Sequence, residues 1–283
     1  MKSGTTPAVN RLDRTLDDLA HRGEKALIAY LTAGDPDPET SLQLLKALVE
    51  GGADMVELGL PFSDPLADGP VIQQASTRAL AAGTRVETVF RLAGALRVRH
   101  PDVPVILLTY VNPVLRRGVE RFMEEAAGAG IDALVIPDLP IEEAEDLLAA
   151  ASGAGLHLIP FAAPTTTEAR LAQLSGRSGG FVYCVSITGV TGARSQAPVG
   201  IDHLVARLRR HTDMPVAVGF GISTPEQAAA VAAVADGVIV GSALVKEVGR
   251  AVEEGRLFQL PETLRQRVFD LKQAMAGTRR IHI

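Results

Sequence analysis

One segment, residues 56–70 with the sequence VELGLPFSDPLADGP, carries the residues of this chain that are best suited to chemistry. Glu57 lies inside an apolar run that predicts a strand, and Asp64 and Asp68 stand with three prolines on the loop that follows. A strand interior rarely contains a charge, because a buried carboxylate without a partner costs more free energy than packing returns. We therefore expect this segment to contribute functional residues to a site that the rest of the fold supports.

The direction of the Glu57 side chain follows from strand alternation, which places Met55 and Glu57 on one face and Val56 and Leu58 on the other. The second pair suits a face covered by helices, so Glu57 is expected to point into the enclosed side of the sheet. In the reversed register Glu57 would lie between strand and helix, also buried. A structural carboxylate bonded to a hydroxyl is the alternative, but burial would raise its pKa, which suits a general acid.

Asp68 is expected to be solvated and ionised, because it lies on a loop. The order Asp68-Gly69-Pro70 is equally typical of a turn or helix cap. If both acids are functional, their pKa values should be shifted in opposite directions, which is a recurring acid/base arrangement.

Two glycine-containing turns, 219–223 and Gly241-Ser242, each precede a predicted helix. Free backbone N–H groups at such helix starts bind anions, so the two turns predict a phosphate site that includes Gly221, Gly241 and Ser242. Glycines that only permit tight turns are the alternative.

These residues must be positioned by strands that alternate with helices along the whole chain. Eight strands, each followed by a helix, predict a (β/α)8 barrel with its active site at the carboxyl ends of the strands. An open doubly wound sheet is the alternative, but no G-x-G-x-x-G motif follows any predicted strand. The expected strands are Ala26–Leu31, Met55–Gly59, Val105–Tyr110, Ala133–Pro137, Leu156–Phe161, Phe181–Ser186, Val216–Phe220 and Gly237–Val240.

The expected helices include three additions to the repeat, at the N-terminus, after the second strand and at the C-terminus. We expect one α/β domain over residues 1–283, with frayed tails at 1–10 and 277–283. Besides the helix after Gly241-Ser242, the expected helices include Asp13–Arg22, Glu39–Glu50, Pro70–Ala82, Val86–Arg99, Leu115–Ala129, Ile141–Ala151, Thr167–Leu174, Ile201–Arg210, Pro225–Val234 and Pro261–Met275.

Composition excludes several classes of function. The chain has 283 residues, a net charge of −5 and no tryptophan, which argues against a nucleic-acid groove. Its single cysteine, Cys184, fits a reducing cytoplasm, and neither a signal peptide nor a membrane-spanning apolar run is present. We expect a soluble cytoplasmic protein.

The usual electron sinks of a carbon–carbon lyase are missing from the predicted barrel mouth. The six histidines have no metal-ligand spacing, and Lys25 and Lys246 lie away from the carboxyl ends of the strands. If the chain is a lyase, its substrate must absorb the electrons.

The chain resembles the tryptophan synthase alpha chain family over residues 11–255. The motifs that carry the resemblance are residues 31–36 (LTAGDP), 57–70 (ELGLPFSDPLADGP), 189–192 (GVTG), 219–223 (GFGIS) and 241–243 (GSA). The resemblance implies a barrel that cleaves indole-3-glycerol phosphate to indole and glyceraldehyde 3-phosphate, with the indole ring as electron sink.

The resemblance also implies roles for individual residues. Glu57 matches the general acid/base and Asp68 the carboxylate that holds the indole N–H. The other matched residues are Tyr183, near Glu57; Tyr30 and Leu108, at the indole pocket; Thr191, on a lid; Gly192, Gly221, Gly241 and Ser242, at the phosphate; and Asp64, Asn112, Asp138 and Pro140, facing a beta subunit that carries pyridoxal phosphate.

No cofactor is expected in this chain, and an αββα tetramer is the implied assembly. Ile187 departs from the family, since some relatives have arginine at this lid position. The alternatives are a stand-alone lyase, a catalytically inactive barrel that regulates a beta subunit, and a sugar-phosphate isomerase. Neither of the last two would need the acidic segment.

Overall fold

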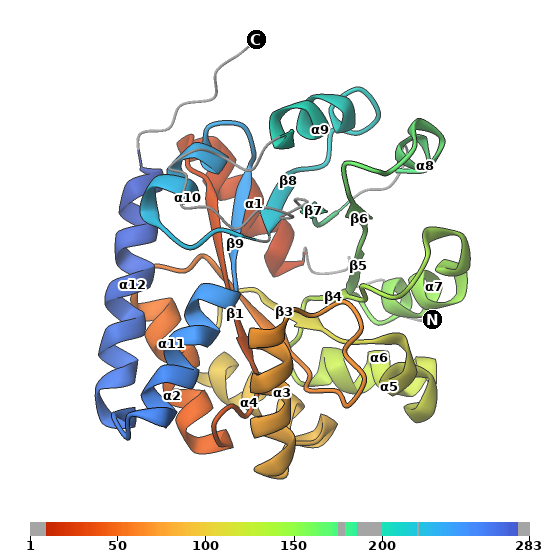
Figure 1. Ribbon diagram of the computed structural model, residues 1–283. Helices are drawn as coiled ribbons and strands as arrows, with labels where there is room; N and C mark the ends of the chain where they lie inside the picture. Colours follow the sequence, from red (N-terminus) through yellow and green to blue (C-terminus); the bar gives the residue numbers. More distant parts are fainter. Residues whose placement is uncertain (1–9, 175–178, 186–199, 220, 277–283) are drawn as a thin grey trace.

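The computed structural model describes residues 10–174, 179–185, 200–219 and 221–276, which form a parallel barrel surrounded by helices (Figure 1). Within these residues, one parallel sheet has the order β5-β4-β3-β2-β1-β9-β8-β7-β6. The strands are β1 (Ala26–Thr32), β2 (Met55–Gly59), β3 (Val105–Leu108), β4 (Ala133–Val135), β5 (His157–Ile159), β6 (Phe161–Ala162), β7 (Val182–Val185), β8 (Val216–Gly219) and β9 (Gly237–Val240).

The first and last strands in this order, β5 and β6, follow each other directly in the sequence, so the sheet is a nearly closed barrel. The expected strand Leu156–Phe161 is divided at Pro160 into β5, which pairs with β4, and β6, which pairs with β7. Proline has no N–H to donate to a ladder, which accounts for the division. The predicted (β/α)8 class is confirmed, with the fifth strand in two parts.

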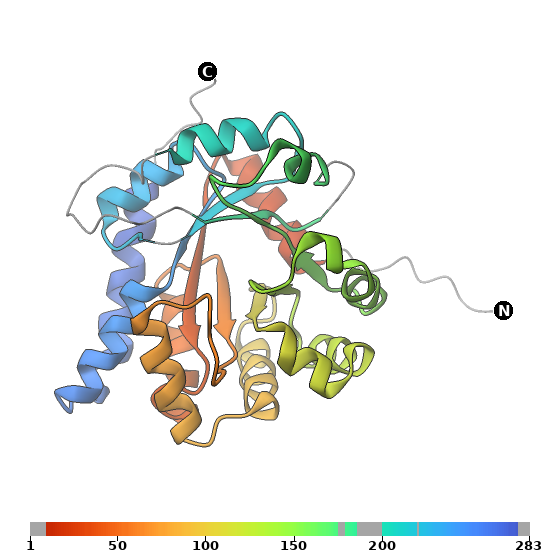
Figure 2. The same cartoon turned by 45° about the vertical axis from the view of Figure 1, so that its right-hand side comes forward.

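The helices cover the outside of the barrel, and Figure 2 shows them around the strands from a second side. They are α1 (Arg11–Arg22), α2 (Pro38–Glu50), α3 (Pro70–Ala81), α4 (Val86–Arg99), α5 (Val111–Arg117), α6 (Val119–Gly128), α7 (Glu145–Gly153), α8 (Glu168–Ala172), α9 (Ile201–Leu208), α10 (Pro225–Ala232), α11 (Ser242–Glu253) and α12 (Leu260–Met275), with short 3₁₀ turns η1 (Ile141–Glu143) and η2 (Leu257–Gln259).

Several predicted element boundaries were wrong, among them the helix expected over Ile141–Ala151, which is the 3₁₀ turn η1 followed by α7. The helix expected over Leu115–Ala129 is two helices, α5 and α6, because Gly118 adopts a φ of 90° between them. The third strand ends at Leu108 rather than Tyr110, and Tyr110 is instead the N-cap residue of α5. The Tyr110 side chain therefore belongs to the barrel mouth.

Alternation along each strand separates two hydrophobic cores. Met55 lies in the inner cluster with Ile28 and Ile106, whereas Val56 and Leu58 belong to the outer cluster beneath the helices. The face predicted for Glu57 is thus the interior of the barrel, as the alternation of β2 indicated.

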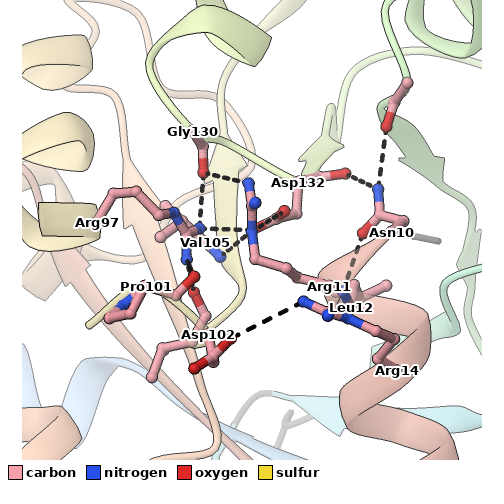
Figure 3. A network of polar contacts seen from close by, with 12 residues as sticks. Asn10, Arg11, Leu12, Arg14, Arg97, Pro101, Asp102, Val105, Gly130 and Asp132 are labelled. Atoms are coloured by element: carbon pink, nitrogen blue, oxygen red, sulfur yellow. Dashed lines mark hydrogen bonds and ion pairs between the residues drawn. The ribbon is translucent and has the colours of Figure 1, made fainter. Parts of the chain in front are cut away.

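Helix α1 packs its leucines against the inner cluster at the amino-terminal end of the barrel, and a polar network holds it there (Figure 3). Asp132, whose side chain is 3% exposed, pairs with Arg11 Nε at 2.8 Å and with Arg97 Nη2 at 2.9 Å. Asn10, within the range expected to be a frayed tail, is the N-cap of α1 and donates to the carbonyls of Asp132 and Gly155. Among the helices described here, none combines the length and apolar character that crossing a bilayer requires.

Candidate active site

Glu57 stands on β2 inside the barrel, opposite Tyr30 of β1 in the strand register. Its side chain is 1% exposed, and neither carboxyl oxygen has a hydrogen-bond partner among the described residues. Burial, followed by the charge of Asp68, raises the pKa of Glu57 to about 8. Because a buried charge is costly, the carboxyl group keeps its proton at neutral pH and can donate it.

Asp68 is half-buried on the loop between β2 and α3. Burial raises its pKa to about 6, and a hydrogen bond from the Tyr110 hydroxyl opposes that rise. The same hydroxyl accepts the Ala67 N–H at 3.1 Å, so Tyr110 fixes both the backbone and the carboxylate of this loop. Our expectation of opposite pKa shifts for the two acids was wrong, because the loop is less solvated than its sequence suggests.

The two acids still differ in protonation at neutral pH. With pKa values of about 8 and about 6, Glu57 is mainly protonated at pH 7 and Asp68 mainly ionised. The barrel mouth therefore offers a proton donor and a fixed negative charge to one bound molecule.

Two tyrosine rings lie beside these acids, and glycines on neighbouring strands make room for them. A Cβ at Gly59 would lie 2.1 Å from the Tyr30 hydroxyl, and one at Gly219 would lie 2.8 Å from the Tyr183 ring. Burial raises the pKa of both tyrosines; the charge of Asp68 adds to this at Tyr30 and that of Glu57 at Tyr183. Both hydroxyls are consequently neutral, and the four side chains share one electrostatic environment.

Apolar groups complete the wall of the site. Leu108 is partly buried at the end of β3, beside Gly59 of β2 in the register. Phe161 of β6 lies with its ring centroid 4.9 Å from that of Tyr183. Phe161 was not predicted from the sequence as a site residue. It could have been found from its pairing with Tyr183 in the strand register, which places both rings on the inner face of the barrel.

The two predicted phosphate turns differ in the structure. At the start of α10, the Gln227 side-chain oxygen accepts the Ser223 N–H at 2.8 Å and belongs to a capping box with Thr224. At the start of α11, no side chain of the described residues caps the helix after Gly241, and its first turn contains no acid. The free N–H groups of α11, at Ser242, are therefore the better anion site.

The remaining predicted residues lie on loops, at the start of α5 or outside the described part of the chain. Gly221 is exposed with a φ of 76°, a left-handed conformation that favours glycine. Asp138 accepts the Val111 N–H at 2.9 Å. The four predicted partner-facing residues are all exposed: Asp64, Asn112, Asp138 and Pro140. The predictions for Thr191, Gly192 and Ile187 lie outside the described residues.

The fold and the site define an α/β barrel with a buried, protonated carboxyl group among apolar and tyrosine side chains at its mouth. A model of the tryptophan synthase alpha chain family matches residues 16–275. The chain belongs to this family, and is accordingly a lyase-type enzyme of tryptophan biosynthesis with a beta subunit as partner. Members carry no cofactor of their own, since pyridoxal phosphate belongs to the beta subunit.

Individual relatives agree with the family assignment. The chain is 52% identical over 266 residues to the tryptophan synthase alpha chain of Methanosarcina mazei, covering 94% of each chain. It is 50% identical over 245 residues to that of Carboxydothermus hydrogenoformans, covering 87% of this chain and 91% of the relative. The crystal structure of tryptophan synthase subunit alpha from Legionella pneumophila superposes with a TM-score of 0.87 at 38% identity, covering 95% of this chain and 99% of the other.

Proposed function

We propose that the chain cleaves indole-3-glycerol phosphate to indole and glyceraldehyde 3-phosphate, with Glu57 as general acid and base. The observation that carries the proposal is a fully buried carboxyl group at the barrel mouth, with a pKa of about 8 and no hydrogen-bond partner among the described residues. An acid left unbonded in the resting site is free to bond the substrate.

In the proposed reaction, the proton of Glu57 is transferred to carbon 3 of the indole ring, which leaves a positive charge on the ring nitrogen. The bond between that carbon and the glycerol chain then breaks, and its electron pair restores the aromatic indole. The hydroxyl on the glycerol carbon becomes the aldehyde and returns its proton to Glu57. Atoms and charge balance, and the carboxyl group ends in its starting state.

Asp68 would accept a hydrogen bond from the indole N–H and stabilise the positive ring. Its pKa of about 6 keeps it ionised at neutral pH, as this role requires. Tyr30, Leu108 and Tyr183 would enclose the indole ring. The phosphate would bind at Gly192, Gly221, Gly241 and Ser242, and Thr191 would belong to a lid with Asp68 as its partner, as the resemblance to the family implies.

We also propose that the single-domain chain works in the cytoplasm, as the alpha part of an αββα tetramer. The exposed Asp64, Asp138 and Pro140 lie on loops after β2 and β4, and the exposed Asn112 lies at the start of α5 after β3, which favours one shared face for the beta subunit.

Replacing Asp68 with Asn tests the proposed site. The variant keeps the shape of the side chain but loses its charge, so we expect turnover to fall by about a hundredfold or more, with circular dichroism unchanged. The control is Asp102→Asn, whose side chain is 89% exposed far from the mouth and which should leave turnover unaltered. Normal turnover of the Asp68 variant would reduce Asp68 to a structural residue of the loop before α3.

A further inference from the structure

A buried ion pair lies at the same end of the barrel as the acids but contacts neither of them. Asp35, just beyond the end of β1, is 3% exposed. Arg78 of α3 donates from Nε and from Nη2 to its two carboxylate oxygens, each at 2.8 Å. Such a two-point contact fixes both distance and orientation between the elements that it joins.

Helix α3 depends on this contact more than its neighbours do, because its buried face is small. Its buried residues are Ala75, Ser76 and Ala79, whereas α4 buries larger side chains such as Phe90 and Leu92. Val71 and Ile72 add partly buried contacts, but small side chains interlock less deeply than large ones, so packing alone leaves α3 more freedom to shift than α4. The pair with Asp35 removes that freedom.

The position of α3 determines the position of Asp68, because the first turn of the helix is bonded to the Asp68 backbone. Asp68 directly precedes Gly69, the N-cap of the helix. The Gln73 side chain donates to the Asp68 carbonyl at 2.9 Å, and the Gln73 N–H donates to the Gly69 carbonyl at 3.0 Å. A movement of α3 therefore moves the backbone that carries the Asp68 carboxylate.

The Arg78 guanidinium also lies against α11, beside α3 in Figure 1. A Cβ at Gly249 would lie 3.5 Å from Arg78 Nη1, an ordinary van der Waals contact. One side chain thus joins the end of β1, the helix that follows Asp68, and the helix that begins at the proposed phosphate residue Ser242.

We propose that Arg78 and Asp35 are positioning residues that hold the Asp68 carboxylate in its working place at the barrel mouth. The inference rests on the catalytic role proposed for Asp68. Its physical basis is the sensitivity of a reacting geometry to small shifts, since a displacement of about 1 Å can cost about a hundredfold in rate.

The first test is Arg78→Lys, which keeps the charge but replaces the planar fork with a single point donor. Measured with the beta subunit present, kcat for cleavage should fall by about tenfold, while KM changes by less than about threefold. The matched control is Arg97→Lys, which weakens a similarly buried pair with Asp132 beside α1, at the amino-terminal end of the barrel. Both variants should melt at lower temperature, but only the Arg78 variant should lose kcat.

A double-mutant cycle separates positioning from general damage. If Arg78 acts through Asp68, Arg78→Lys should cost nothing further, within about twofold, in a chain that already carries Asp68→Asn. Asp35→Asn, which retains one acceptor oxygen for Arg78, should behave in the same way and provides a second measurement if the lysine variant folds poorly.

Either of two results would overturn this inference and leave the proposed function untouched. One is that Arg78→Lys also costs tenfold in the Asp68→Asn background; the other is that Arg97→Lys loses as much kcat as Arg78→Lys. Full turnover of Asp68→Asn by itself would overturn the role proposed for Asp68, and this inference with it, but not the role proposed for Glu57.

Discussion

Glu57→Gln is expected to lose at least about a thousandfold in turnover while the barrel folds and binds substrate as before. Glutamine has the same shape as the protonated acid, but it can neither give a proton to the indole ring nor take one from the glycerol hydroxyl. Positioned acid–base groups contribute about 10² to 10⁴ in rate, and here one group performs both transfers.

The measurement is indole release from indole-3-glycerol phosphate, with the beta subunit present, alongside calorimetric titration of the variant with the uncleaved substrate. Glu50→Gln, an exposed substitution at the end of α2, serves as the control. An active Glu57→Gln chain that binds normally would remove Glu57 from the reaction.

The second large effect is on stability, because a buried acid costs free energy once it is ionised. The pKa of Glu57 is about 8 in the folded chain against 4.5 for the free side chain, so the folded state holds the extra proton between these values. Stability must then fall as pH rises through this window, and the loss is complete above pH 8. The full shift corresponds to roughly 5 kcal/mol as an upper limit.

Urea unfolding of the wild type and of Glu57→Gln at pH 5 and pH 9 isolates this cost. Between the two pH values, the wild type should lose several kcal/mol relative to the variant. The raised pKa of Asp68 affects both chains alike and drops out of the comparison. Equal losses in the two chains would mean that Glu57 ionises at its ordinary pKa.

The part of the structure that could be predicted from the sequence follows from periodic patterns. Alternation along 55–58 was sufficient to place Glu57 inside the barrel, and the eight strand–helix units were sufficient to predict the closed sheet. The first prediction depends on the two-residue period of a strand, and the second on the succession of strand and helix patterns. Both are patterns of apolar residues that can be recognised locally in the chain.

The parts that could not be predicted depend on contacts between distant residues. The pKa of Asp68 is set by the burial of its loop and by Tyr110, which lies 42 positions away along the chain. The capping box of α10 depends on the direction of the Gln227 side chain, and the start of α11 has no side-chain cap. Pro160 was visible in the sequence, but its effect on strand pairing could be inferred only with both neighbouring strands in place.

The most direct test of the central claim is indole release from indole-3-glycerol phosphate by the purified wild-type chain, measured with and without a tryptophan synthase beta subunit. We predict slow cleavage by the chain alone and a strong rise in rate when the beta subunit is added. Absence of cleavage in both conditions would contradict the proposed reaction, and would leave a barrel whose substrate is a different molecule.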